Sequence, residues 1–347
     1  MLYVKGYMSD CHACGHIRLE VPARAINATR SDVRVDCKTD VLCSDFIGTN
    51  LMVFQRNHQP DIYQKMLAAK SMGIKTVYEL DDDMLNMPVD FDLPYKFYAK
   101  PEVRETMLAF MRNCDALTVS TVTLGESVRK QTPRPSYVVP NAIDLDRWRE
   151  AQLARDVRLA IGKHNEVVIG WMASGSHLID IPLVDQALCR IFRDHANVKL
   201  SIIGTLSMEH FAKYELKNYA DRIVFRNWVE INALPGFMAD FDIGIAPLVD
   251  CPFNLCKSGL KFLQMSALGI PGVHTDLQMY RDLCTNDRDG FLATPGNWHE
   301  PLEALVSDAE LRKRISSFAL QNVQEYDILR TSGNWVSAWK SVMTQWT

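Results

Sequence analysis

Short apolar runs alternate with amphipathic stretches along most of the chain. In the first half, runs rich in apolar and β-branched residues predict strands at residues 2–5, 51–55, 76–80, 116–120 and 137–139. Apolar positions at helical spacing predict helices between them, at residues 61–71, 102–112 and 124–130. Strands that alternate with helices in this way indicate βαβ units, and therefore parallel sheets.

The second half repeats the alternation. We expect strands at residues 167–171, 199–203, 223–225, 242–246 and 272–274, with helices that begin near Ile181, Met208, Ala233, Ser258 and Leu277. Residues 144–164, between the halves, are polar and show little strand character. The pattern predicts an α/β protein of two doubly wound, Rossmann-like domains that face a cleft, formed by residues 1–150 and 151–325.

The tail of the chain differs from both halves because its pattern is helical only. It carries Trp335, Trp339 and Trp346. Side chains of this size need a surface against which to be buried. We therefore expect residues 326–347 to form a C-terminal helix that crosses back onto the first domain.

Composition places the chain among ordinary globular proteins of about two domains, since 347 residues exceed the size of one core. The formal net charge of −4 gives no overall field that would attract nucleic acid or an anionic membrane. No apolar run approaches the roughly 18 residues that a membrane span requires, and no signal peptide is recognisable. Nine scattered cysteines are typical of reduced thiols, so we expect a cytoplasmic protein.

The segment of residues 251–271 carries the clearest chemical signal. It has a strand end, a polar loop with Lys257 and Lys261, and an amphipathic helix. The backbone amides of Ser258 and Gly259 at the helix start, together with the two lysines, would hold an anion such as a nucleotide diphosphate. The alternative is a solvated helix start with ordinary surface lysines.

Four segments together resemble GT-B glycosyltransferases of family 4, also called group 1. Residues 138–144 (Val-Val-Pro-Asn-Ala-Ile-Asp) are similar to the interdomain signature of that family, and residues 257–271 to its donor-binding loop and helix. Residues 169–177 and 241–247 are similar to two strands of the donor domain. The resemblance is good over residues 138–295 and implies a GT-B fold whose C-terminal helices cross back to the N-terminal domain.

The same resemblance implies an enzyme that moves a sugar from a nucleotide-sugar donor, with a UDP-sugar favoured, to a hydroxyl acceptor with retention of configuration. In such enzymes a donor phosphate, stabilised by cations such as Lys257 and Lys261, accepts the proton of the acceptor. Because this chemistry depends on electrostatic stabilisation and positioning, no protein nucleophile, cofactor or divalent metal is needed.

Two positions depart from the family pattern. Family members carry two glutamates eight positions apart, whereas this chain has Cys256 and Gln264. The second glutamate usually holds the ribose hydroxyls, and Gln264 would hydrogen-bond them without a charge. The first usually touches the sugar, a task to which Cys256 is poorly suited, so the family does not indicate which sugar is transferred.

Loops after three strands supply further candidates. Ser174, Gly175 and Ser176 follow the first strand of the second half and would contact phosphate or sugar, or else form a plain turn. In resembling enzymes, a loop that corresponds to Gly15 and Arg18 lies near the sugar, and Arg18 would reach the leaving phosphate. Its alternative is a surface loop.

His58 follows another strand and would hold the sugar, or is a satisfied loop histidine.

Three consecutive carboxylates follow the strand at residues 76–80. We expect Asp81, Asp82 and Asp83 to bind the acceptor, together with Arg56 at a neighbouring strand end. Capping of the next segment, a basic partner, or a metal as in GT-A enzymes are the alternatives. A zinc site that begins at residues 11–14 is a weaker idea, because the second cysteine pair is loosely spaced.

The acceptor stays open among a carbohydrate, a lipid-linked sugar, a protein hydroxyl and DNA. The N-terminal half resembles bacterial and bacteriophage enzymes, some of which glycosylate hydroxymethylated DNA bases, and this favours the cytosol of a bacterium or of a phage-infected host. Residues 96–134 hold seven basic and four acidic residues, a modest platform for phosphates. A nucleotide-sugar epimerase of GT-B fold and a non-catalytic sugar- or nucleotide-binding module are the alternative functions.

Overall fold

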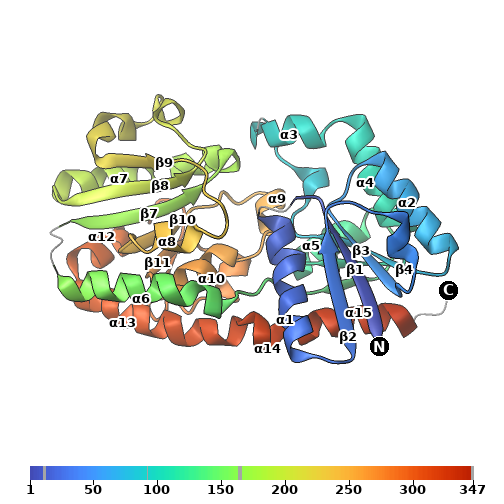
Figure 1. Cartoon of the computed structure of the whole chain (residues 1–347). Helices are drawn as coiled ribbons and strands as arrows, with labels where there is room; N and C mark the ends of the chain where they lie inside the picture. Colours follow the sequence, from blue (N-terminus) through green and yellow to red (C-terminus); the bar gives the residue numbers. More distant parts are fainter. Residues whose placement is uncertain (11–12, 92, 163–165, 345–347) are drawn as a thin grey trace.

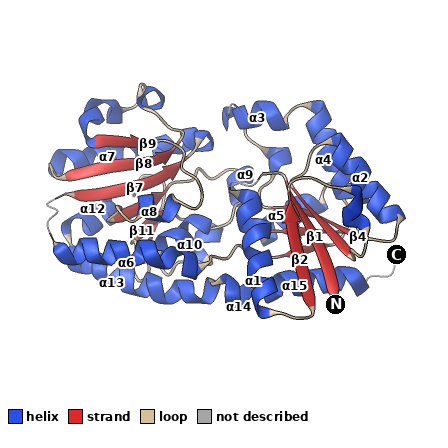
Figure 2. Cartoon of the chain, in the orientation of Figure 1, coloured by secondary structure: helices blue, strands red, loops and turns tan. Residues whose placement is uncertain are grey.

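Two parallel six-stranded sheets, each covered by helices, lie side by side in the molecule (Figures 1 and 2). The structure is a computed structural model that describes residues 1–10, 13–91, 93–162 and 166–344. All pairings within both sheets are parallel, as the βαβ pattern predicts.

The N-terminal sheet has the order β2-β1-β3-β4-β5-β6. Its strands are β1 Leu2–Met8, β2 Val33–Lys38, β3 Leu51–Gln55, β4 Lys75–Leu80, β5 Ala116–Val119 and β6 Ser136–Val138. Its helices are α1 Val21–Thr29, α2 Pro60–Ser71, α3 Leu93–Tyr98, α4 Pro101–Asn113 and α5 Val122–Arg129, with short turns at η1 His16–Glu20, η2 Cys43–Phe46, η3 Met84–Asn86 and η4 Val89–Phe91. The sequence pattern missed β2, an edge strand whose charged residues Arg34 and Asp36 interrupt the apolar run.

The C-terminal sheet has the order β12-β11-β10-β7-β8-β9. Its strands are β7 Val167–Ala173, β8 Val198–Gly204, β9 Ile223–Arg226, β10 Ile243–Ala246, β11 Gly272–Thr275 and β12 Phe291–Ala293. Its helices are α7 Ile181–Asp194, α8 Leu234–Met238, α9 Pro252–Leu255, α10 Leu260–Ala267, α11 Gln278–Arg281, α12 His299–Ser307 and α13 Ala309–Asn322, with η5 Gly175–Asp180 before α7. Where the sequence predicted a helix at Met208, the chain forms two 3-10 segments, η6 Met208–Phe211 and η7 Glu215–Arg222.

Helix α10 lies unusually close to its sheet. A Cβ atom on Gly244 of β10 would come within 2.5 Å of the Met265 sulfur on α10. A side chain at this strand position would therefore push the helix away, so Gly244 allows α10 to pack close to strand β10.

The chain passes between the two sheets twice. Residues 139–144 make the first passage and lead into α6 Leu145–Ile161, whose Trp148 packs into the core of the C-terminal half. The part of residues 144–164 that the structure describes, in which the sequence shows little strand character, is therefore largely helical.

The second passage runs through α13, η8 Val323–Tyr326, α14 Ile328–Thr331 and α15 Gly333–Thr344, along the lower edge of Figure 1. Trp335 and Trp339 are buried against the N-terminal sheet, beside Val4 and Val33. The expected return of the C-terminal helices to the N-terminal domain is thereby confirmed. Trp346 lies outside the described residues.

No helix of the described residues combines the length and the apolar character needed to cross a membrane.

Candidate active site

The site lies where the carboxyl ends of the strands of both sheets approach each other. Polar contacts between described residues join the halves there. The Lys257 ammonium is 3.5 Å from an Asp82 carboxylate oxygen, and the Thr121 hydroxyl donates to the Cys256 carbonyl at 2.8 Å. The Asn141 amide donates to the Ser258 hydroxyl at 2.7 Å. The loop between α9 and α10 therefore contacts three loops of the N-terminal half.

A cavity of about 220 Å³ opens beside α10, and we call it the Lys261 cavity. Apolar side chains, among them Met172, Ile203 and Trp228, form much of its wall. Its polar side chains include Ser174, His177, Lys261 and Gln264. An apolar wall with a few convergent polar groups is typical of a small-molecule site.

Lys261 is held by a histidine rather than by a carboxylate. Its ammonium nitrogen lies 2.8 Å from His177 Nε2, and His177 Nδ1 lies 2.7 Å from an Asp180 carboxylate oxygen. Burial, with the nearby Lys257 charge, lowers the pKa of Lys261 to about 7. Burial and the neighbouring Lys261 lower the pKa of His177 to about 4, so this imidazole is neutral.

A second cavity of about 360 Å³ lies between the halves, and we call it the aromatic cavity. Its walls carry four rings, Phe91, Phe97, Tyr98 and Phe253, with two methionines. Its charged side chains are Arg56, Asp82 and Lys257, and the Lys257 ammonium lies 4.7 Å from the centre of the Phe253 ring. The position suits a ligand with a flat apolar face and a few polar groups.

Both cavities are bordered by the loop of residues 174–176, which we call the serine loop, and by the segment of residues 257–261. Ser174 lines the Lys261 cavity, whereas Ser176 lines the aromatic cavity, and their hydroxyl oxygens are 2.9 Å apart. Lys261 and Lys257 divide in the same way between the two cavities. A ligand that extends from one cavity to the other would pass these serines and lysines.

Arg56 has a strained backbone, with φ of 54° at the end of β3. Its guanidinium donates to the Tyr98 hydroxyl at 2.8 Å and lies 3.4 Å from an Asp81 carboxylate oxygen. A non-glycine residue in the left-handed region persists only where the surroundings fix it, and such strain is common at functional sites.

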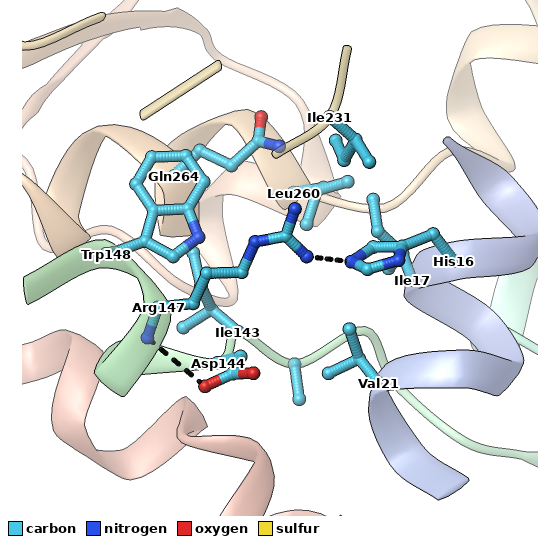
Figure 3. Close-up of a pocket in the computed structure, with 11 residues that line it drawn as sticks. His16, Ile17, Val21, Ile143, Asp144, Arg147, Trp148, Ile231, Leu260 and Gln264 are labelled. Atoms are coloured by element: carbon cyan, nitrogen blue, oxygen red, sulfur yellow. Dashed lines mark hydrogen bonds between the residues drawn. The ribbon is translucent and has the colours of Figure 1, made fainter. Parts of the chain in front are cut away.

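A small pocket of about 30 Å³ lies beside the first passage of the chain (Figure 3). Arg147, at the start of α6, extends toward His16 of η1 and donates to its Nε2. His16 Nδ1 lies 2.8 Å from a Glu20 carboxylate oxygen, and burial lowers the pKa of His16 below its usual range. Gln264 borders both this pocket and the Lys261 cavity.

Residues 168–308 match the family model described as glycosyl transferases, group 1. The Anabaena protein HepE, solved in complex with UDP-glucose, aligns with a TM-score of 0.67 at 14% identity, over 98% of this chain and 100% of HepE. Sucrose-phosphate synthase from Thermosynechococcus elongatus aligns with a TM-score of 0.70 at 11% identity, over 99% of both chains.

WaaG, a glycosyltransferase involved in lipopolysaccharide biosynthesis, aligns with a TM-score of 0.65 at 13% identity, over 97% of this chain and 99% of WaaG. No curated protein sequence matches. The chain has the GT-B fold. Its sequence resemblance to group 1 glycosyltransferases is confirmed by the family match over residues 168–308.

In this GT-B framework, the three consecutive carboxylates have three different surroundings. Asp82 faces the aromatic cavity, and Asp81 lies beside Arg56. Asp83 is buried and accepts hydrogen bonds from the Ser127 hydroxyl at 2.5 Å and the Asn86 amide at 2.9 Å. In the described part of the chain, no three metal-ligating side chains come together. The residues of the proposed zinc site include Cys11 and His12, which lie outside the described residues.

Arg18 lies inside the GT-B molecule rather than at the cleft surface. It is 1% exposed, pairs with Glu79 at 2.8 Å, and stacks on the Trp335 ring at 4.5 Å. The same guanidinium donates to the Asn141 side chain at 2.8 Å. Its expected contact with a leaving phosphate conflicts with this burial, because both ion pairing and stacking fix the side chain in the interior.

The other sequence candidates differ in their positions. Ser258 and Gly259 line a third cavity, of about 420 Å³, rather than the Lys261 cavity. Gly15 packs against Met8 at the end of β1. His58 is half-buried, packs edge-on against Phe97 with ring centres 5.0 Å apart, and has a pKa lowered by burial.

Sequence reasoning underestimated His177 and did not identify Asp180 or the aromatic rings. A histidine and an aspartate three positions apart, directly after a strand and a turn of small residues, was the available signal for the first pair. The rings come from residues 91–98 and Phe253, so only the fold brings them together.

Proposed function

We propose that this protein transfers a sugar from a UDP-sugar to a hydroxyl acceptor, with retention of configuration and without a metal. The observation that carries the proposal is the meeting of two cavities at the serine loop and the two lysines. A nucleotide sugar consists of a base, a diphosphate and a sugar in this order. The base suits the apolar wall of the Lys261 cavity, the diphosphate suits the two lysines, and the sugar suits the side of the aromatic cavity.

The Lys261 cavity would hold the nucleotide. Trp228, which is 53% exposed, offers a ring for the base, and Gln264 offers an amide for the ribose hydroxyls. Lys261 and Lys257 would neutralise the diphosphate. The complex of the structural neighbour HepE with UDP-glucose supports uridine over other nucleosides.

In the proposed reaction, the bond between the anomeric carbon and the diphosphate oxygen breaks as the acceptor oxygen bonds to the same face of that carbon. The acceptor proton passes to a diphosphate oxygen, and Lys261 and Lys257 stabilise the negative charge of the leaving group. The positions of both reactants supply the rest of the rate enhancement, so no protein nucleophile takes part.

We place the acceptor in the aromatic cavity as well, next to the donor sugar, and propose a carbohydrate. Ring faces such as Phe97 and Tyr98 suit the C–H face of a sugar, and Asp82 accepts hydrogen bonds from hydroxyls. The four rings and the hydroxyl-accepting carboxylate of Asp82 support a carbohydrate, so transfer to a hydroxymethylated DNA base is the less favoured form of the proposal.

The first test is donor binding, measured by thermal unfolding with UDP-, GDP- and ADP-sugars. A donor at 100 times its Kd stabilises the folded protein by about 2.7 kcal/mol. UDP-sugars should raise the melting temperature, and Lys261→Ala should abolish the rise. If no nucleotide sugar shifts the transition, the proposal fails.

The second test follows the fate of the sugar. Protein with the best donor is incubated alone, with an oligosaccharide panel, and with hydroxymethylated and unmodified DNA duplexes. Mass spectrometry should find glycosylated oligosaccharide, and proton NMR should show the anomeric configuration of the donor retained. An epimer formed without acceptor supports an epimerase instead, while binding with neither hydrolysis nor transfer supports a non-catalytic module.

A further inference from the structure

Lys261 is partly buried in the wall of its cavity and has no counter-charge in contact. Among the residues described, no carboxylate lies within 4.0 Å of its ammonium nitrogen, and His177 is the partner at 2.8 Å. The acid that acts electrostatically on Lys261 is Asp180, whose two oxygens are already used. One lies 2.7 Å from His177 Nδ1, and the other accepts from the Val249 amide at 2.7 Å.

The chemistry of the three groups fixes the proton on the imidazole. A lysine nitrogen in either protonation state can donate to His177 Nε2, which is then the acceptor. His177 Nδ1 therefore carries the hydrogen and donates to Asp180. The aspartate thus orients the imidazole, and the imidazole orients the Lys261 nitrogen, by the same logic by which outer partners orient metal-ligating histidines.

The charges around Lys261 do not compensate the partial loss of water around its ammonium group. Lys257, on the preceding loop, is repulsive, and His274 of β11 is neutral because burial and Lys261 lower its pKa to about 3. Asp180 attracts from behind His177. Burial outweighs this attraction and brings the pKa of Lys261 to about 7, so part of the free protein holds the neutral amine at pH 7.5.

We propose that Lys261 takes up a proton when the donor diphosphate binds, and that His177 and Asp180 are the pair that positions Lys261 for this purpose. The proposal rests on the proposed donor, because it requires an anion beside Lys261. The diphosphate supplies the counter-charge that the free cavity lacks, so binding favours the ammonium form. Proton uptake then makes donor affinity depend on pH.

The direction of this dependence follows from linkage. Below about pH 7, Lys261 is already protonated in the free protein, and binding takes up little proton. Above it, binding must add the proton, so the Kd for the donor rises with pH, by up to about tenfold per pH unit. The rise continues until the pH exceeds the pKa of Lys261 in the complex.

Isothermal titration calorimetry with UDP-glucose tests the proposal, because its diphosphate is a diester without a titrating group between pH 6 and 8.5. At pH 7.5, titrations in phosphate and in Tris should give different binding heats that correspond to uptake of more than about half a proton. Lys261→Arg stays charged and should show no uptake. Equal heats in both buffers for the wild-type protein would overturn the proposal.

The positioning pair has its own variants. His177→Ala should weaken UDP-glucose binding about tenfold, whereas His177→Gln, which keeps an acceptor for Lys261, should retain most of the affinity. Asp180→Asn removes a negative charge that raises the pKa of Lys261. In this variant, binding of UDP-glucose should therefore begin to weaken at a lower pH. Thermal unfolding checks that each variant is folded. An unchanged pH profile in Asp180→Asn contradicts the positioning role.

The outcomes separate this inference from the proposed function. Absence of UDP-glucose binding to wild-type protein, with binding of no other nucleotide sugar, defeats the proposed function. Binding without proton uptake leaves the proposed function standing and defeats the inference alone.

Discussion

Gln264 is a position at which this chain differs in charge from the enzymes it resembles. It is buried on α10, borders the Lys261 cavity, and stands where resembling enzymes have a glutamate. A neutral amide forms weaker hydrogen bonds to hydroxyls than a carboxylate does. At this position the proposed donor site therefore has a neutral amide where resembling enzymes have a carboxylate.

Restoring that charge should tighten donor binding. We expect Gln264→Glu to lower the Kd for UDP-glucose about fivefold to tenfold, because charge-assisted hydrogen bonds are roughly twice as strong as neutral ones. Gln264→Leu, which keeps the volume but no acceptor, should raise it about tenfold. Calorimetry at pH 7 measures both, and weaker binding by Gln264→Glu would contradict the ribose assignment.

Arg18 and Glu79 form a buried ion pair whose contribution to the free energy of unfolding depends on pH. Burial raises the pKa of Glu79 to about 7, against the opposing effect of Arg18. Because the pKa of Glu79 is higher in the folded protein than in the unfolded chain, its protonation contributes stability to the fold. This contribution is fully present below the unfolded pKa near 4.5 and is lost as the pH rises through 7. Removal of Arg18 therefore lowers the free energy of unfolding most above pH 7, where Glu79 is charged.

We expect Arg18→Met to destabilise the protein by about 3–5 kcal/mol at pH 8 and by clearly less at pH 5.5, because Glu79 is protonated there. Urea unfolding at the two pH values measures the difference. The double variant Arg18→Met, Glu79→Gln should recover most of the loss at pH 8. An equal cost at both pH values would indicate that lost packing on Trp335 dominates.

The sequence could single out Lys257, Lys261 and the serine loop because helix starts and strand ends constrain what nearby residues can do, and these residues line the two cavities. It could not separate Asp81, Asp82 and Asp83, since three identical side chains receive their surroundings from the turn that follows β4. It took Arg18 for a cleft residue because its partners Glu79 and Trp335 are 61 and 317 positions away.

At the scale of elements, helix α15 completes the core of the N-terminal half. Trp335, Trp339 and Val342 are each at most 2% exposed and pack with residues of β1, β2 and α1. The sequence predicted this return from the tryptophans alone, since large rings on a terminal helix need a partner surface. Regular elements such as α2 and α4 were also predictable, because their periodic patterns are long.

Short and edge elements were not predictable in the same way. Strand β12 has only three residues, and β2 carries charges at the edge of its sheet. The 3-10 segments η6 and η7 follow a helix-like pattern that tertiary packing overrides. Local patterns describe such elements poorly because their neighbours decide their form.

Truncation of a ring on α15 should cost far more than truncation of a charge. We expect Trp339→Ala to destabilise the protein by about 3–5 kcal/mol, through lost burial and the cavity left behind. The adjacent Lys340→Ala is the matched control, since its ion pair with Asp32 at 2.7 Å is exposed and contributes little. Urea unfolding compares them, and similar midpoints for both would contradict the docking of α15.

At the scale of the whole molecule, the two halves touch through polar contacts and through apolar ones such as Phe91 with Phe253, and are joined by two chain passages. The contact between Arg147 and His16 is sensitive to protonation, because a charged imidazole would repel the guanidinium that donates to it. Burial lowers the pKa of His16, so this repulsion is absent near neutral pH.

We therefore expect the molecule to open as the pH falls through the lowered pKa of His16, with an increase in radius of gyration measured by small-angle X-ray scattering. His16→Gln keeps an acceptor that does not titrate and should remove the change. Arg147→Met, which has no charge to repel, should also be insensitive to pH. Persistence of the opening in both variants would assign it to other groups.

The return of α15 also has a consequence for biosynthesis. Domains generally fold in the order in which they leave the ribosome. Here the first half cannot complete its core until residues 335–342 have emerged, after nearly all of the second half has been made. Val4, Val33 and Val77, whose cluster includes residues of both α1 and α15, lack the contribution of α15 throughout that interval, so the nascent chain should depend on chaperones until α15 arrives.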